Sequence, residues 1–203
     1  MNSLTKNTYE GEWEEDLKNG NGKEIYPDGS TYEGNFKKGK KNGQGKLYLL
    51  NGTLYEGTFK DDMIDGKGKI KWNNDKVCIG NWKNNVLTGF GKLYQNKDIY
   101  IGYFENDKKN GLGINFYYSS KSQILGKWVD DSIEGLAIFS TKKNPEIKIW
   151  EMENKKIIYT YTNEEIKNKV TYREDFIRLK EFYLCLKEAG EIPNDNIEYS
   201  PIF

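Results

Sequence analysis

The sequence predicts a mainly β protein, an elongated single-sheet repeat solenoid of stacked β-hairpins with a C-terminal α-helical segment. Three observations predict this fold. A short motif of aromatic residues and glycines recurs every 22 to 24 residues, and a fixed period of this kind is typical of repeat architectures. Of the 21 glycines, 20 lie between residues 11 and 135. Beyond residue 170, apolar residues change to the three- and four-residue spacing of a helix face.

The motif is clearest in Tyr32–Phe36, which Gly43-Gln44-Gly45 follows. It occurs six times, with start positions at Tyr9, Tyr32, Tyr55, Cys78, Tyr100 and Ile124. A glycine stands two residues after each start. A large aromatic residue stands four after it, at what we call the ring position: Trp13, Phe36, Phe59, Trp82, Phe104 and Trp128. A G-x-G pair follows in each copy except the sixth, where Ala137 replaces its second glycine.

Each copy is predicted to form one β-hairpin. The start, glycine and ring positions share one parity, so in a strand they face the same side, and polar neighbours such as Glu33 and Asn35 face the other. Seven residues after each start lies the turn position, which holds Asp16, Gly39, Asp62, Asn85, Asp107 and Asp131. Gly, Asn and Asp tolerate the left-handed backbone of hairpin turns. A lone hairpin is unstable in water, so the hairpins are expected to stack around a shared aromatic core.

We divide the chain into three parts. Residues 7–140 hold the six repeats. Residues 141–162 contain two strand-like runs, Ile147–Trp150 and Ile157–Tyr161, which we interpret as a degenerate seventh hairpin. Residues 163–203 form the C-terminal helix and tail.

The C-terminal helix is predicted from an apolar stripe with helical spacing: Tyr172, Phe176, Leu179, Tyr183 and Leu186. Thr171 with Glu174 matches a capping box at its start, and Gly190 is a natural stop. A second capping box, Thr162 with Glu165, predicts a short helix over residues 163–169.

The apolar end of the tail, Ile197–Phe203, is expected to dock on the fold. The sequence leaves three roles open for the helix: capping the sheet end, occupying a groove of the sheet, or pairing with another chain.

Composition argues against catalysis and nucleic-acid binding. The 31 basic and 31 acidic residues cancel, whereas nucleic-acid binders need a basic excess. With no histidine, the commonest general base and metal ligand is missing. Cys78 and Cys185 lie far apart and are expected to be reduced, buried and inert. The G-x-G pairs lack the helix that a phosphate-binding loop needs. We therefore predict no enzyme, no catalytic residue, no metal and no cofactor.

The repeated Tyr-x-Gly-x-aromatic motif, the G-x-G pair and the Asp-Gly and Asn-Gly turns resemble the MORN repeat (membrane occupation and recognition nexus) over residues 7–140. This resemblance implies a β-solenoid that binds partner proteins, with lipid binding a more disputed property of the family. It also implies a cytoplasmic protein associated with the cytoskeleton or a membrane. The N-terminus has no signal-peptide shape, and no apolar run is long enough to span a bilayer.

From these features we predict a non-catalytic protein-binding scaffold or adaptor, with the C-terminal helix as a cap or regulatory element. The simplest role of the rings is the repeat core. The functional hypothesis is an aromatic-lined groove that grips a helix or extended segment of another protein, formed by Tyr32, Phe36, Tyr55, Phe59, Trp82, Tyr100 and Phe104. The alternative is a module that binds acidic phospholipid through one basic hairpin tip: Lys37, Lys38, Lys40 and Lys41. Homodimerisation is left open.

Overall fold

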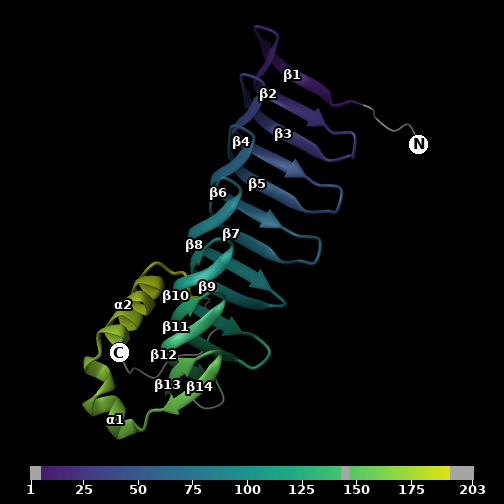
Figure 1. Cartoon of the computed structure of the whole chain (residues 1–203). Coiled ribbons are helices and arrows are strands. Elements are labelled where there is room, and N and C mark those ends of the chain that lie inside the picture. The colour runs from purple at the N-terminus through teal and green to yellow at the C-terminus, as the bar shows by residue number, and fades with distance from the viewer. Residues whose placement is uncertain (1–5, 143–146, 193–203) are drawn as a thin grey trace. The chain divides into compact units, whose positions relative to one another are not determined.

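The computed structural model describes residues 6–142 and 147–192, and its chain divides into two compact units, Met1–Asn96 and Lys97–Phe203 (Figure 1). Strands dominate both units, and two short helices follow the last strand. The predicted class, a mainly β repeat sheet with a C-terminal helical segment, is confirmed.

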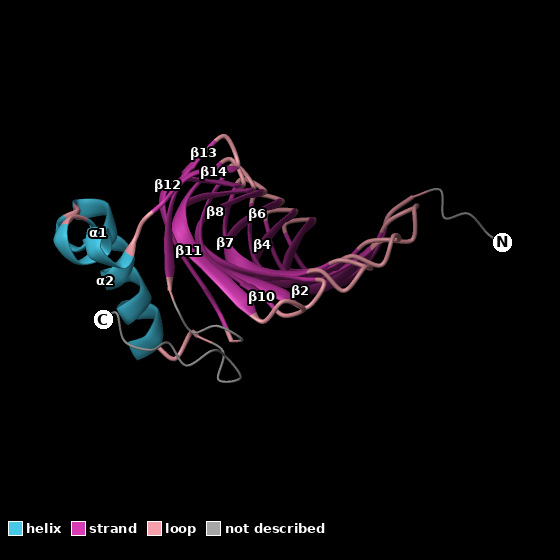
Figure 2. Cartoon of the chain, turned by 90° about the horizontal axis from the view of Figure 1, so that it is seen from below, coloured by secondary structure: helices cyan, strands magenta, loops and turns pink. Residues whose placement is uncertain are grey.

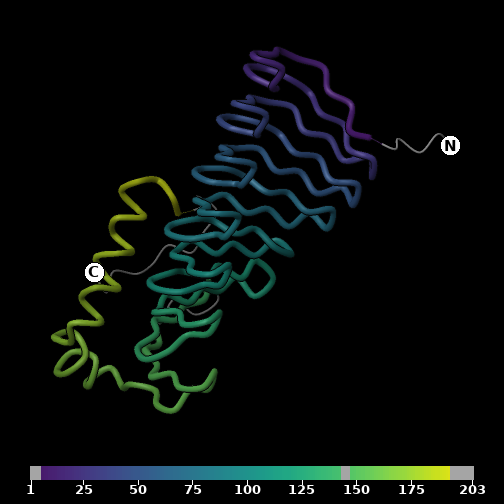
Figure 3. The backbone as a smooth tube through the Cα atoms, turned by 45° about the horizontal axis from the view of Figure 1, so that its top comes forward, coloured from purple at the N-terminus to yellow at the C-terminus, as the bar shows by residue number. Residues whose placement is uncertain are grey.

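The first unit is a run of four β-hairpins. Its strands are β1 (Thr8–Glu14), β2 (Leu17–Ile25), β3 (Thr31–Lys37), β4 (Lys40–Tyr48), β5 (Leu54–Lys60), β6 (Met63–Lys71), β7 (Val77–Lys83) and β8 (Val86–Gln95). Each strand pairs antiparallel with the next one in the chain (Figure 3). Such local pairing is the arrangement that a repeated hairpin motif predicts.

Facing glycines let the tyrosine rings lie flat on the sheet. Gly34 lies opposite Gly45 within its hairpin and opposite Gly22 in the preceding one. A Cβ atom added at Gly45 would lie 2.5 Å from Cε2 of Tyr32, so the ring occupies the space that a side chain would need. The glycines are therefore required by close packing.

The turn positions do more than reverse the chain. All six have positive φ, as predicted; Asp62, for example, has φ 68°. In addition, the Asp62 N–H donates to the carbonyl of Lys41 (3.0 Å), and its carboxylate accepts from the Lys41 N–H (2.9 Å). The same pair of bonds joins Asn85 to Ile64. We call this reciprocal pair the latch, because it ties these turns to the preceding hairpin.

The second unit contains β9 (Asp98–Glu105), β10 (Lys108–Tyr117), β11 (Ser122–Val129), β12 (Ser132–Thr141), β13 (Lys148–Glu153) and β14 (Lys156–Thr160), again paired in chain order. Between β13 and β14, Asn154 and Lys155 have φ of 50° and 64°, which is the turn geometry of the other hairpins. These two strands lie in the segment that we interpreted as a degenerate seventh hairpin.

Two helices follow β14. Helix α1 (Asn163–Asn168) begins with the capping box of Thr162 and Glu165 that the sequence predicts. A short 3-10 turn, Val170–Tyr172, separates it from α2 (Glu174–Glu188), and Gly190 follows α2 with φ 68°.

The capping box predicted for Thr171 and Glu174 is wrong. The N-cap of α2 is Arg173, and the hydroxyl of Thr171 donates to the Lys167 carbonyl instead (3.0 Å). The 3-10 turn places Thr171 ahead of the helix, and it leaves Tyr172 79% exposed rather than in the apolar stripe. The remaining stripe residues are buried: Phe176, Leu179, Tyr183 and Leu186. The docking predicted for Ile197–Phe203 lies outside the described residues.

Helix α2 lies on a face of the second unit's sheet (Figure 2). The helix contacts β11, and the ring of Phe182 is 6.2 Å from the ring of Tyr103 on β9. Tyr103 points away from the side that carries Tyr100 and Phe104, since its parity is opposite. The helix therefore covers the face opposite the motif rings.

Candidate interaction surfaces

The motif rings of the first unit form a continuous ladder of edge-to-face contacts. The ring of Tyr32 lies 5.1 Å from Phe36 in its own hairpin and 5.0 Å from Phe59 in the next. Tyr55 repeats this arrangement with Phe59 and Trp82, at 5.1 and 5.8 Å. Phe36 and Phe59 are thus each held between two tyrosines, in the geometry that aromatic quadrupoles favour. We call this series the ring ladder.

The ring ladder is buried. The seven residues predicted to line a groove are at most 4% exposed: Tyr32, Phe36, Tyr55, Phe59, Trp82, Tyr100 and Phe104. The first five contact one another in the first unit, and the last two contact each other in the second, with ring centroids 5.2 Å apart. The expectation that these rings stay partly exposed is therefore wrong for the described side chains, because neighbouring rings cover them.

The tyrosine hydroxyls complete the ladder. Tyr55 donates to the carbonyl of Thr58 (3.0 Å), and Tyr32 donates to the carbonyl of Asn35 (2.9 Å). Burial raises the pKa of Tyr55 to about 12 and also raises the pKa of Tyr32 and Tyr100. These phenols are neutral hydrogen-bond donors in a packed core, which is a structural role.

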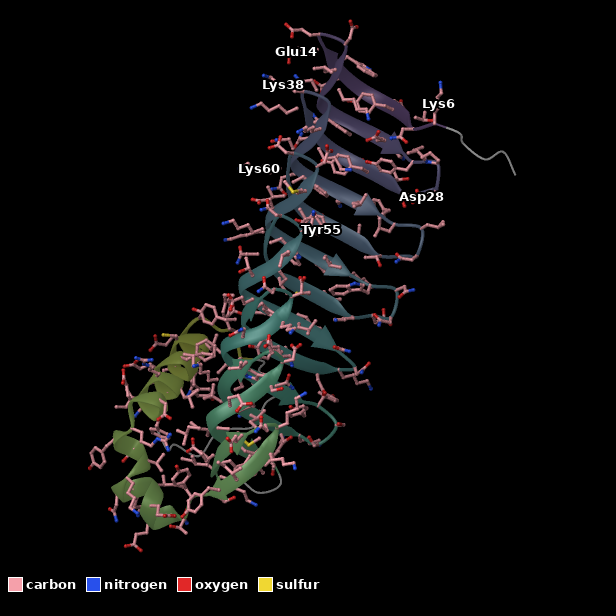
Figure 4. The ribbon with its side chains drawn as sticks, viewed as in Figure 1. Lys6, Glu14, Asp28, Lys38, Tyr55 and Lys60 are labelled. Carbon is pink, nitrogen blue, oxygen red and sulfur yellow. The ribbon has the colours of Figure 1, made fainter. Side chains whose placement is uncertain are left out.

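The four lysines of the predicted lipid site do not act as one group. Lys37, Lys38 and Lys40 are exposed at the β3–β4 tip, and Lys38 is labelled there in Figure 4. Lys40 lies 3.9 Å from Asp61. Lys41 turns onto the sheet, where its Nζ donates to the Tyr26 hydroxyl (2.8 Å) and lies over the ring of Tyr32.

The face opposite the ring ladder presents two polar rows in the first unit. Directly paired residues alternate in charge along the first, which we call the charge row: Glu10, Lys23, Glu33, Lys46, Glu56 and Lys69. All six are exposed. Lys46 lies 3.0 Å from Glu56, and this hydrogen bond raises the lysine's pKa. Opposite charges in register stabilise a sheet pairing.

A groove runs between the charge row and a parallel row of amides. Asn21, Asn35 and Gln44 form the second wall, where the Asn35 amide donates to the side-chain oxygen of Asn21 (2.8 Å). Facing glycines, among them Gly34 and Gly45, form the floor. The groove is open and measures about 670 Å³. Backbone forms this floor because alternate residues along a strand point to opposite faces, so the residues between the two polar rows point to the ring face.

The same row of the second unit is aliphatic. Its directly paired members, which we call the aliphatic row, are Ile101, Ile114, Leu125, Ile138 and Ile149. None is more than 5% exposed. They share the face on which α2 lies, and α2 supplies a buried apolar stripe of its own. The sequence carries this signal, since charged residues become Ile and Leu at fixed repeat positions, but we did not predict the row.

Among the described residues, no group of three or more His, Cys, Asp or Glu side chains could hold a metal ion. Cys78 is 1% exposed, as predicted, but Cys185 is exposed, because it lies beside rather than within the apolar stripe of α2. Within the described part of the chain, no helix has the length and apolarity needed to cross a membrane.

Stacked hairpins with a shared ring ladder and extended polar rows define a β-hairpin repeat protein. A family model of the MORN repeat matches five consecutive segments, residues 9–31, 32–54, 55–77, 78–99 and 100–114. The chain therefore belongs to the MORN-repeat family. Repeats of this family are non-enzymatic modules that generally bind proteins or membranes.

Two further comparisons were made. A search of curated proteins gave no match. Among solved structures, the chain is similar to the TCP domain of SAS-4 (dCPAP) from Drosophila melanogaster, solved in complex with a proline-rich motif of Ana2 (dSTIL). The identity is 12%, the match covers 67% of this chain and 88% of that chain, and the TM-score is 0.32.

Proposed function

We propose that this protein is a non-catalytic scaffold that binds another protein on the groove of its first unit, between the charge row and the amides of Asn21, Asn35 and Gln44. One observation carries the proposal: the first unit's predicted groove rings, Tyr32, Phe36, Tyr55, Phe59 and Trp82, are buried, whereas this polar groove on the opposite face is open to a partner. Exposed side chains on a rigid sheet suit recognition of an extended segment or helix with complementary charges.

Membrane binding through the β3–β4 tip has less support. Each lysine or arginine close to an anionic lipid surface contributes about 1 kcal/mol to the binding free energy. At this tip Lys41 points inward and Lys40 has Asp61 beside it, which leaves Lys37 and Lys38 as exposed cations without a carboxylate within ion-pair distance among the described residues. We expect no flotation with vesicles of acidic phospholipid at physiological salt. Flotation that disappears in a Lys37→Glu, Lys38→Glu variant would favour the membrane function instead.

The scaffold function is tested by exchanging two charges in the groove wall. The double variant Glu33→Lys, Lys46→Glu keeps the net charge and the opposite charges of this one cross-strand pair, places like charges beside Lys23 and Glu56, and reverses the pattern that a partner meets. A matched control, Lys40→Asp with Asp61→Lys, exchanges an ion pair at the tips. In quantitative affinity purification, we expect proteins retained by the wild type to fall at least tenfold with the groove variant and to persist with the control. Equal retention by the groove variant would contradict the proposal.

A further inference from the structure

We propose that β1 is a docking edge for a β-hairpin of the same repeat type from another polypeptide, whose outer strand reads G-x-G-K. This inference rests on the proposed scaffold function and names one class of partner for it. Strand β1 ends the sheet of the first unit, and among the described residues it pairs only with β2. The hairpin of β1 has three structural features, here called devices, by which interior hairpins bind the hairpin that precedes them.

The first device is the ring position. Phe36, Phe59 and Trp82 are 4%, 2% and 4% exposed, because each lies between its own tyrosine or cysteine position and the tyrosine of the preceding hairpin. Trp13 occupies the same position, but among the described residues its ring contacts only the ring of Tyr9, at 5.0 Å, and it is 59% exposed. The missing contact is the one that a tyrosine of a preceding hairpin makes.

The second device is the latch. Asp62 and Asn85 each bind the backbone of the preceding hairpin with both the N–H and the side chain. Asp16 occupies the same turn position, with φ 59°, and it makes no hydrogen bond to any described residue. A preceding hairpin would supply the N–H and carbonyl that Asp16 is placed to bind.

The third device is the charge row. Glu33 lies between Lys23 and Lys46, and Glu56 lies between Lys46 and Lys69. Glu10 has Lys23 on one side and no paired strand on the other. By the same register, the incoming strand must present a lysine beside Glu10.

The chain itself shows which strand fits. Glycine lies opposite the ring position wherever two hairpins of the first unit meet, as in Gly20 with Phe36 and Gly43 with Phe59. The interior strands that make these contacts read G-x-G-K at Gly20–Lys23, Gly43–Lys46 and Gly66–Lys69. Edge glutamates usually discourage strand addition, so Glu10 restricts docking to a strand with a matching lysine.

The C-terminal edge of this chain does not supply such a strand. Strand β14 is only five residues long, and the chain turns into α1 where the pairing segment would continue. By the repeat register, Tyr159 stands where the glycine opposite Trp13 is required. The first hairpin thus has the binding features of an interior hairpin at its outer edge, whereas the last hairpin lacks the glycine that such pairing requires. A second copy joined through β14 is therefore a poor occupant.

The test uses the full-length protein and a cyclised hairpin peptide that copies residues 32–48, carries a fluorescent label and is held in hairpin form by the ring closure. We expect saturable binding by fluorescence anisotropy. Trp13→Ala should weaken it at least tenfold, while Leu50→Ala, which alters a side chain 74% exposed at another loop, should leave it unchanged. Glu10→Lys should weaken binding of the native peptide. A peptide carrying Lys46→Glu should bind this variant again.

Absence of binding by the cyclised hairpin, equal binding to Trp13→Ala, or no rescue by charge exchange overturns the proposal. The Glu33→Lys, Lys46→Glu groove variant is included to distinguish failure of the proposed groove function from failure of docking at β1. This variant should still bind the peptide. Analytical ultracentrifugation of the protein alone should show a monomer. A dimer abolished by Trp13→Ala would make a second copy the occupant and contradict the partner proposed here.

Discussion

The charge row and the aliphatic row occupy the same repeat positions, yet the charge row is exposed and the aliphatic row is among the most buried parts of the molecule. Lys46 and Ile114 both stand fourteen residues after their start positions, Tyr32 and Tyr100. In the first unit the row faces solvent, and alternating charges pair across the strands. In the second unit α2 lies on that face, and aliphatic side chains fill the row.

This difference shows that the motif specifies only half of the sheet. Tyrosines, glycines and ring residues build one face in every well-formed repeat, whatever covers the other face. The positions between them then record the environment of that second face, polar where it meets water and apolar where a helix covers it. The two faces of one strand are thus selected by different neighbours.

The largest expected effect comes from placing a lysine, as found in the charge row of the first unit, at the equivalent position of the aliphatic row. Ile114→Lys puts an ammonium group where the side chain is 0% exposed, and we expect it to lower the free energy of unfolding by about 4 kcal/mol. The reverse change, Lys46→Ile, alters an exposed position and should stay within about 0.5 kcal/mol. Urea unfolding followed by circular dichroism measures both. Similar losses for the two variants would mean that the rows do not differ in burial.

Truncating the covering helix should cost somewhat less. Leu179 is 2% exposed in the stripe of α2, so Leu179→Ala should destabilise the protein by about 3 kcal/mol through lost burial and the cavity left behind. Ile177 is 41% exposed on the same helix, and Ile177→Ala serves as the control with a loss below about 1 kcal/mol. If α2 covers the aliphatic row, amide hydrogen exchange at Ile114 should also accelerate in Leu179→Ala only.

Sequence reasoning was most successful where one local rule decided the outcome. Strand parity, the positive φ at residues such as Asp62, and the capping box at Thr162 follow from chemistry within a few residues, and the structure confirms them. Burial of the rings was harder, because exposure depends on how neighbouring hairpins approach. The sequence placed Phe59 in a row, but only the stacking distance shows that Tyr32 and Tyr55 cover it from both sides.

The latch and the position of α2 escaped prediction for the same reason. Turn formation alone accounts for an aspartate at a turn position. Its second role, binding the preceding hairpin, therefore has no separate signal in the sequence. The apolar stripe identifies helix α2. The face of the sheet on which it packs, however, follows from Ile101, Ile114 and Leu125, which lie far from the helix in the sequence. Their break from the Glu/Lys pattern was readable in the sequence once two faces are considered separately.

A third prediction concerns the ring-bearing face of the first unit. A Cβ atom at Gly57 would lie 2.5 Å from the Gly68 Cα, which is backbone and cannot yield easily. At Gly80 the nearest atom is a side-chain carbon of Leu87 at 2.9 Å, and backbone begins at 3.6 Å, because Cys78 replaces the tyrosine. We expect Gly57→Ala to cost about 2 kcal/mol and Gly80→Ala less than about 1 kcal/mol in thermal or urea unfolding. Equal losses would show that the tyrosine does not set the need for glycine.

Alkaline pH should weaken the ring ladder. The pKa of Tyr55 is raised to about 12 in the folded state by burial, above the ordinary value of about 10. A raised phenol pKa means that the stabilisation is complete below about pH 10 and is lost as the pH rises through about 12. Urea unfolding between these limits should show a falling free energy, with a shallower slope in Tyr55→Phe. An unchanged slope in that variant would mean that Tyr55 ionises as readily folded as unfolded.

The smallest effect is expected within the charge row itself. Lys46→Glu places a carboxylate between Glu33 and Glu56, the direct neighbours of Lys46 in register, and it removes the 3.0 Å ion pair with Glu56. Because all three side chains are exposed, we expect a loss of only about 0.5 kcal/mol, decreasing further as salt screens the repulsion. Urea unfolding at low and high salt measures this change. A much larger loss would show that the charge row holds the first unit together as strongly as burial holds the second.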